Sequence, residues 1–176
     1  IRFVSSHDVG HTLGLRHNMG ASHATPVEKL RDKAWVEAHG HTASIMDYAR
    51  FNYVAQPEDK IGPKGLFPRI NDYDKWAIKW GYSYRPEFKD EYEEKEAMMT
   101  ETSRFLAGHP RCWFSGEGRD EDPRSQTEDL GDDNMKANEY GVKNLKRVIA
   151  GLPQWTHQDN DQYSDLAEVY KSVRDQ

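Results

Sequence analysis

The sequence predicts a mainly α-helical chain with little sheet of its own. Two stretches near the carboxyl end carry apolar residues at the i, i+3, i+4, i+7 spacing of one helix face, first Leu145, Val148, Ile149 and Leu152, then Tyr163, Leu166, Ala167 and Tyr170. Residues that cap helices or end them divide the rest of the chain into further helical segments. The semi-apolar segment 43–59 alternates too little to predict a strand.

The first half is expected to contain two helices. Residues 1–17 predict a helix that leaves its axis at Gly14, a residue type common at helix ends. A short helical stretch is expected over 27–38, after Pro26. Residues 57–68, with three prolines and two glycines, predict a loop.

The second half is expected to be helical on both sides of a charged loop over 116–134. Asn71 or Asp72 predicts the start of a helix that stops at Gly81. Pro86 predicts the start of the next helix, which ends before Gly108 and Pro110 and whose apolar face comprises Phe88, Tyr92, Met99 and Leu106. After the loop, Asp132 or Asp133 is expected to cap a helix that stops around Gly151 and Pro153, before the last helix.

The composition excludes several classes of protein. The 176 residues suffice for one domain, and no apolar run is long enough to span a membrane. The net charge of −6 and the lack of a dense Lys/Arg stripe argue against nucleic-acid binding. The single Cys112 excludes an intrachain disulfide framework and a cysteine-rich zinc site. Since the chain opens on Ile1 without a signal-peptide pattern, we expect it to be a piece of a longer protein.

Three closely spaced histidines are the strongest chemical signal. His7 and His11 are four residues apart, so a helix places both imidazoles on one face. Gly14 supplies the bend that lets His17 return toward them. Three neutral imidazoles with one open position are typical of a catalytic rather than a structural zinc site. The alternative is that the three merely face solvent.

The sequence HDVGHTLGLRH resembles the long zinc-binding signature HExxHxxGxxH of the metzincin metallopeptidases, and SIMDY, at 44–48, resembles their Met-turn. Segments such as RHNMGAS and PRINDYDKWAIKWGY are similar to a group of large bacterial metzincins from Bacteroidetes. The resemblance implies that His7, His11 and His17 bind Zn²⁺. It implies that Met46 packs beneath them without ligating the metal, and that Tyr48 donates a hydrogen bond to the tetrahedral intermediate.

Asp8 is a departure from this family, which has a glutamate general base at that position. On a helix, residue 8 lies about 100° from His7 and about 60° from His11, so its carboxylate flanks the histidine face. Aspartate is one methylene shorter, which withdraws the carboxylate by about 1.5 Å. Three outcomes follow: a helix shift restores contact, a second water relays the proton slowly, or zinc remains while catalysis is lost.

The resemblance also implies a division of the chain. Residues 1–55 would hold the zinc helix and Met-turn of a catalytic domain, and 56–176 a helical C-terminal subdomain. Since six residues precede His7, we expect this chain to lack the sheet subdomain that precedes the zinc helix in metzincins. We therefore expect the upstream part of the same precursor to complete the cleft for a peptide or protein substrate.

These features predict a zinc-dependent endopeptidase, weakened by Asp8. One alternative is a pseudo-peptidase that binds zinc and a peptide or protein partner without cutting, and another is a domain that zinc only stabilises. Export to the periplasm, cell envelope or medium is expected from the resemblance alone.

The remaining polar residues carry weaker signals. His23, His39 and His41 are expected to be solvated rather than metal ligands. The segment RCWFSG around Trp113 predicts a packed turn, and neither a phosphate-binding glycine loop nor a serine nucleophile elbow is present. A solvated loop is expected in preference to a calcium site for the acidic residues Asp120, Glu121, Asp122, Glu128, Asp129, Asp132 and Asp133.

Overall fold

The computed structural model describes residues 1–117, 122–160 and 162–176, and these ranges contain helices and turns but no strand. The predicted mainly α-helical class is therefore confirmed. The α-helices are α1 (Arg2–Thr12), α2 (Lys33–His39), α3 (Pro63–Leu66), α4 (Asp72–Tyr82), α5 (Glu91–Gly108), α6 (Asn134–Trp155) and α7 (Ser164–Asp175). Short 3-10 helices lie at Ser22–Ala24, Val27–Leu30, Pro57–Asp59 and Pro110–Cys112.

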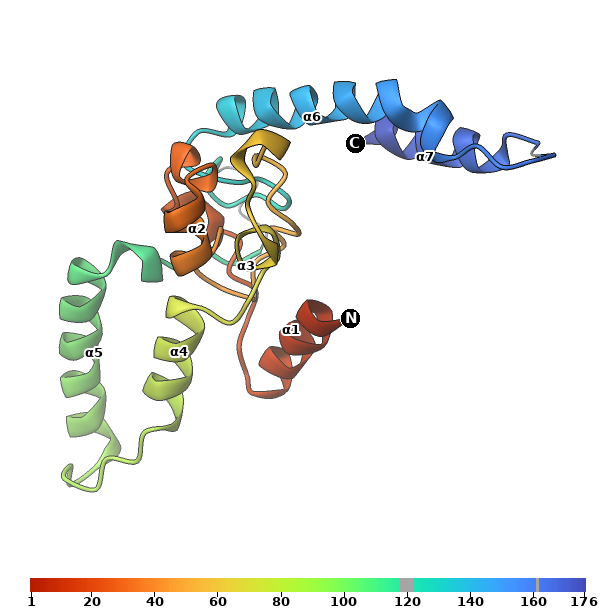
Figure 1. Ribbon diagram of the computed structural model, residues 1–176. Coiled ribbons are helices and arrows are strands. Elements are labelled where there is room, and N and C mark those ends of the chain that lie inside the picture. The colour runs from red at the N-terminus through yellow and green to blue at the C-terminus, as the bar shows by residue number, and fades with distance from the viewer. Residues whose placement is uncertain (118–121, 161) are drawn as a thin grey trace.

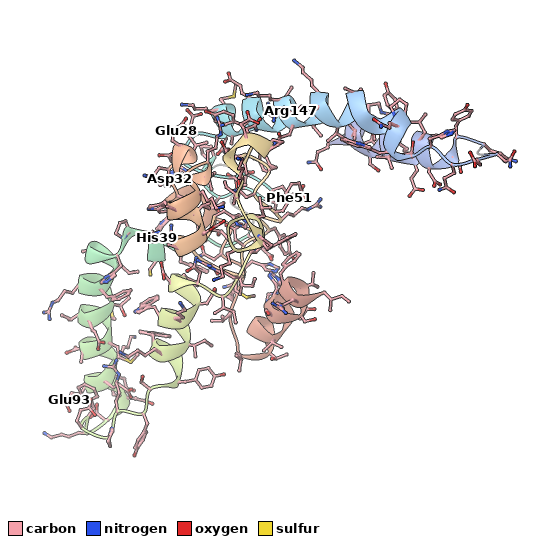
Figure 2. The ribbon with its side chains drawn as sticks, in the orientation of Figure 1. Glu28, Asp32, His39, Phe51, Glu93 and Arg147 are labelled. Atoms are coloured by element: carbon pink, nitrogen blue, oxygen red, sulfur yellow. The ribbon has the colours of Figure 1, made fainter. Side chains whose placement is uncertain are left out.

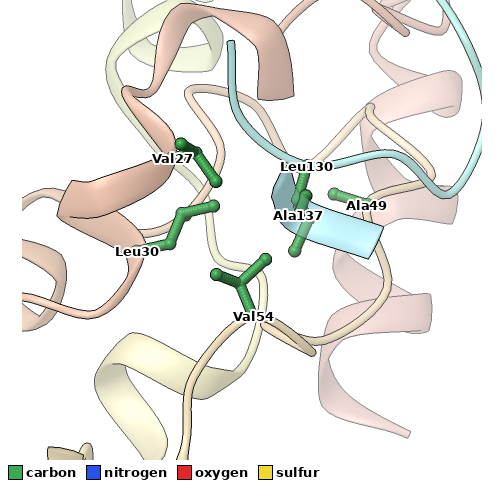
Figure 3. Close-up of a cluster of buried hydrophobic side chains, with 6 residues drawn as sticks. All are labelled: Val27, Leu30, Ala49, Val54, Leu130 and Ala137. Atoms are coloured by element: carbon green, nitrogen blue, oxygen red, sulfur yellow. The ribbon is translucent and has the colours of Figure 1, made fainter. Parts of the chain in front are cut away.

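A small apolar cluster forms the core between segments that are distant in sequence (Figure 3). The partly buried rings of Tyr53 and Tyr140 pack against it. Its buried members are Val27, Leu30, Ala49, Val54, Leu130 and Ala137. Both parts of the predicted division, 1–55 and 56–176, contribute to this cluster, and the division itself stays a prediction.

Three helical arms extend from the core (Figure 1). One is α1, the second is the hairpin of α4 and α5, and the third is the hairpin of α6 and α7. Among the described residues, no helix combines the length and the apolar composition needed to cross a lipid bilayer.

The start of α4 follows the sequence prediction. The Asn71 side chain accepts a hydrogen bond from the backbone N–H of Asp74, and the Asp74 carboxylate accepts one from the backbone N–H of Asn71. This reciprocal capping box satisfies two amides that a helix start leaves without partners. The helix ends at Tyr82, one residue beyond the predicted Gly81.

The prediction for α5 was wrong in its start, and the predicted apolar face is not the one that packs against α4. The helix begins after Asp90, whose carboxylate accepts hydrogen bonds from the amides of Tyr92 and Glu93, rather than at Pro86. Tyr92 and Met99 are 73% and 61% exposed. A different face meets α4, where the ring of Phe105 stacks on that of Trp76 with centroids 5.0 Å apart.

The helix α6 starts as predicted but ends later. Asp133 caps its first turn by accepting a hydrogen bond from the amide of Lys136 at 3.0 Å. The helix then continues through Gly151 and Pro153, because Leu152 is buried at 3% exposure and Thr156 closes the last turn on the Leu152 carbonyl.

Side chains join α6 to the core and to α7. Arg147 forms an ion pair with Glu58 at 2.8 Å, and Lys136 pairs with Glu28. Figure 2 labels Arg147 on α6 and Glu28 on the 3-10 helix Val27–Leu30. Part of the first predicted apolar stripe and the whole of the second line a pocket between α6 and α7, formed by Ile149, Leu152, Pro153, Tyr163, Leu166, Ala167 and Tyr170.

Two other segments differ from their predictions. Residues 57–68, expected as a loop, contain the 3-10 helix Pro57–Asp59 and the short helix α3, since proline is well suited to the first turn of a helix. The stretch expected over 27–38 is divided by Asp32, whose carboxylate accepts a hydrogen bond from the amide of Trp35 and starts α2.

Candidate metal centre

The side chains of His7, His11 and His17 converge on one point. His7 and His11 lie one turn apart on α1, and Gly14, at φ 82°, adopts the left-handed conformation that turns the chain back toward them. The Nε2 atom of His11 lies 3.1 Å from Nε2 of His7 and 3.0 Å from Nε2 of His17, and the latter two are 3.1 Å apart. The predicted convergence of the three rings is thus present.

The opposite ring nitrogens are held by backbone carbonyls. Nδ1 of His7 lies 2.8 Å from the carbonyl oxygen of Ile45, and Nδ1 of His11 lies 3.0 Å from that of Leu15. A carbonyl only accepts, so each Nδ1 donates and each Nε2 keeps its lone pair. This is the tautomer that a metal-binding histidine needs.

The third histidine is held by a carboxylate that the sequence analysis did not identify. Nδ1 of His17 contacts Oε1 of Glu117, one hundred residues further along the chain. Asn18 brings the two segments together, since its amide donates to the Trp113 carbonyl and accepts from the Ser115 amide, both at 3.0 Å. No spacing signal links residues this far apart: Glu117 belongs to the stretch 116–134 that the sequence predicts as a charged loop, directly after the predicted packed turn around Trp113.

The three nitrogens fit a zinc ion. Zinc binds imidazole nitrogen at about 2.0–2.1 Å, so nitrogens 3.0–3.1 Å apart can share one ion and leave a fourth position open. In the part of the chain that the structure describes, these histidines are the one group of three or more His, Cys, Asp or Glu residues close enough to hold a metal. Burial, followed by the proximity of His11 and His7, lowers the pKa of His17, which favours its neutral form.

Met46 lies against the histidine helix. Its side chain is fully buried, and its sulfur packs on the α-carbon of Gly10, so that a methyl group at residue 10 would overlap it. The backbone N–H of Asn18, the residue after His17, donates to the Met46 carbonyl at 3.0 Å. This hydrogen bond joins the segment that carries His17 to the turn at 44–48. The contact places the thioether beside the turn of α1 that contains His7 and His11.

A buried carboxylate supports the same turn from the other side. Asp74 accepts hydrogen bonds from the Ser44 hydroxyl at 2.6 Å and from the Ile45 amide at 2.8 Å. Since the Ile45 carbonyl holds His7, Asp74 connects the start of α4 to the metal centre. Burial raises the pKa of Asp74, although its hydrogen bonds act in the opposite direction.

Tyr48 lies beside two of the three histidines. Its ring centroid is 4.5 Å from that of His17 and 5.3 Å from that of His7, and the residue is 43% exposed. Its backbone carbonyl accepts a hydrogen bond from the Glu128 amide at 3.1 Å. The position of this ring is compatible with the role that the resemblance assigns to it.

Asp8 is exposed on α1, next to the buried His7. No hydrogen bond or ion pair engages its carboxylate within the described residues. His23, His39 and His41, the other histidines considered from sequence, lie outside the group of converging histidines. His39 is exposed and His23 half-buried, but His41 is fully buried, contrary to the expectation that it is solvated.

Several carboxylates of the predicted acidic loop form ion pairs or hydrogen bonds, both within the loop and with distant segments. Asp122 pairs with Arg124 at 2.8 Å, and Glu128 pairs with Arg50 at 2.6 Å. Asp132 accepts a hydrogen bond from the Val27 amide at 2.8 Å. Asp120 and Glu121 lie outside the described residues. Asp129 differs from these acids because it is directed into the protein.

Comparison with known families gives a match over the full length of the chain. The family model described as Met-zincin matches residues 1–176, the whole chain. No curated protein and no solved structure matches it. The narrower resemblance to the Bacteroidetes group stays a prediction.

Proposed function

Since the chain belongs to the Met-zincin family, we propose that it carries the catalytic centre of a zinc-dependent endopeptidase. The observation that supports this most directly is the set of three Nε2 atoms, 3.0–3.1 Å apart, with Tyr48 beside them. His7, His11 and His17 are the proposed zinc ligands, and the exposure of His11 and Tyr48 leaves the centre open to a substrate.

Zinc, when bound, supplies Lewis-acid polarisation of the substrate carbonyl and lowers the pKa of water. In our proposal Asp8 accepts the proton of the attacking water and later returns it to the leaving amine. The Tyr48 hydroxyl donates a hydrogen bond to the oxygen that becomes negative in the tetrahedral intermediate. Met46 holds the helix that carries the first two ligands and takes no part in the chemistry.

The short side chain of Asp8 favours one rival. A pseudo-peptidase would keep the zinc and bind a peptide or protein without cutting it, because the carboxylate does not reach the water. A purely structural zinc is the weaker alternative, since such a site normally closes with a fourth protein ligand. No fourth His, Cys, Asp or Glu joins the cluster in the described part of the chain.

The substrate that we propose is a peptide or protein segment bound in extended form. An upstream segment of the same precursor would provide the edge strand that aligns it. We also propose that the protein is exported, as the resembling proteins are.

Elemental mass spectrometry of the purified chain tests the metal centre, with His11→Ala as the control. We expect about one zinc per chain, lost in the control. Absence of zinc in both proteins would contradict the proposal. Turnover of a broad peptide library by the longest available form of the protein then separates the peptidase from the pseudo-peptidase, because the latter binds zinc but releases no product.

A further inference from the structure

Asp47 follows Met46 in the sequence but belongs to a different environment. The residue is 2% exposed. Its Oδ2 atom accepts hydrogen bonds from the Ser22 amide at 2.6 Å and the Thr42 hydroxyl at 3.1 Å. Its Oδ1 atom is buried and has no hydrogen-bond partner within the described residues. A buried carboxylate oxygen without a partner is costly, so it indicates that something else binds there.

Asp129 approaches the same point from the segment after residue 122. The hydroxyl of Ser22, whose amide binds Asp47, donates to Oδ1 of Asp129 at 3.3 Å. The Asn134 side-chain amide donates to Oδ2 of Asp129 at 3.2 Å, while Oδ1 of Asn134 is buried and also has no partner among the described residues. Ser22 therefore bonds to both carboxylates. The two atoms without partners, Oδ1 of Asp47 and Oδ1 of Asn134, are both oxygen acceptors.

The charge of the pair is not balanced by the protein. The recorded hydrogen bonds of the two carboxylates, across the described residues, come from an amide N–H, two hydroxyls and a side-chain amide, and none comes from Lys, Arg or His. Burial raises the pKa of both groups, that of Asp129 to about 6, and the charge of Asp129 adds to the rise at Asp47. Two buried like charges require either a proton or a cation between them.

We propose that Asp47 and Asp129 bind a hard divalent cation, Ca²⁺, with Oδ1 of Asn134 as a further ligand. Every donor atom here is oxygen, which excludes the nitrogen and sulfur chemistry of a second zinc site and suits Ca²⁺. The mixture of carboxylate and amide oxygens matches the flexible coordination of Ca²⁺ better than the strict octahedron that Mg²⁺ requires.

The cation would stabilise the surroundings of the histidine site without contacting its ligands. Asp47 lies between Met46 and Tyr48, and Glu128, which precedes Asp129, holds the Tyr48 carbonyl through its amide. A cation between Asp47 and Asp129 thus joins the turn below the histidines to the segment 122–134. This inference does not depend on the proposed peptidase activity.

Terbium luminescence provides the direct experiment. Tb³⁺ occupies oxygen-ligated calcium sites. Burial, and then the nearby charge of Asp129, raises the pKa of Tyr53 to about 12, so this ring lies close enough to the pair to sensitise the emission. The chain is stripped with a chelator, titrated with Tb³⁺ and then with Ca²⁺ or Mg²⁺. Thermal unfolding is followed under the same conditions for Asp129→Asn, for the charge-matched control Glu128→Gln and for His11→Ala.

We expect saturable emission that Ca²⁺ displaces more effectively than Mg²⁺, and a higher Tm in Ca²⁺. Asp129→Asn should lower the Ca²⁺ affinity at least tenfold, while Glu128→Gln, whose carboxylate faces Arg50, should bind as the unmodified chain does. His11→Ala should lose zinc and keep the calcium response.

The proposal is wrong if Ca²⁺ changes neither the emission nor the Tm of the unmodified chain, a result that needs no variant to fold. It is equally wrong if Asp129→Asn is more stable than the unmodified chain at every Ca²⁺ concentration, because the two carboxyls then share a proton.

Discussion

The sulfur of Met46 occupies the space in which a side chain at residue 10 would begin. Gly10 is the residue of α1 that comes directly before His11, and both Gly10 and Met46 are buried. The helix that carries two of the candidate ligands can therefore approach the turn below it only because residue 10 has no side chain.

Gly10→Ala should consequently disturb the metal centre. The added methyl group overlaps the Met46 sulfur, and overpacking of this kind costs about 1–3 kcal/mol of folding free energy. Gly81→Ala is the matched control, because nothing lies within 4 Å of a methyl group placed there. Because alanine has a higher helix propensity than glycine, this control should gain up to about 1 kcal/mol of folding free energy. Urea unfolding and zinc content measure both effects, and equal stability of the two variants would contradict the close packing.

Asp8→Glu should raise the rate of peptide hydrolysis. The longer side chain restores the missing methylene, and general acid–base catalysis typically contributes about 10²–10⁴-fold, so a gain of about tenfold or more in kcat/KM is expected. Zinc content should stay the same, since Asp8 is exposed and is not among the converging ligands. Equal rates for the two proteins would show that Asp8 already reaches the water or that the residue is not the base.

Glu117→Gln should weaken zinc binding without abolishing it. The amide loses the charge that orients and polarises His17, and loss of such a partner typically lowers metal affinity about 10–100-fold. Competition with a chromophoric chelator gives the affinity. Glu101→Gln is a suitable control, because that carboxylate forms an exposed ion pair with Arg85 on a different arm. Equal zinc affinities for the two variants would exclude a role for Glu117 in orienting His17.

His41 should make the fold sensitive to acid. Burial lowers the pKa of this histidine to about 4, against 6.5 for an ordinary histidine. Between about pH 4 and pH 6.5, His41 is therefore protonated in the unfolded chain but neutral in the folded protein. The contribution of His41 to stability is then fully present above about pH 6.5 and is lost as the pH falls, by about 2 kcal/mol between pH 7 and pH 5. The measurement is urea unfolding in the His11→Ala background, where zinc release does not contribute. His41→Leu should reduce the difference between the two pH values, and an unchanged difference would assign it to other groups.

Local sequence patterns were sufficient for several elements. The spacing of His7 and His11, the bend at Gly14 and the two helix caps each depend on a few neighbouring residues. The structure contains the spacing and the bend, and of the two candidates for each cap it uses Asn71 and Asp133. In these segments the sequence determines the backbone directly.

Features that depend on distant neighbours could not be predicted in the same way. The face of α5 that packs is determined by contact with α4. This contact is made by Phe105, whereas Tyr92 is exposed. Glu117 reaches His17 only because Asn18 holds the turn around Trp113. The burial of His41 likewise follows from packing rather than from its local sequence, so each of these outcomes required the folded arrangement.

The three arms of Figure 1 imply unequal protection of backbone amides from solvent exchange. Amides of the hairpins α4–α5 and α6–α7 can open locally while the cluster around Leu30 and Val54 stays intact, so they should exchange faster than those of the core segments. The first turn of α4 is the exception within its arm. Asp74 ties it to the turn that holds His7, so its amides should exchange only when the metal centre itself comes apart.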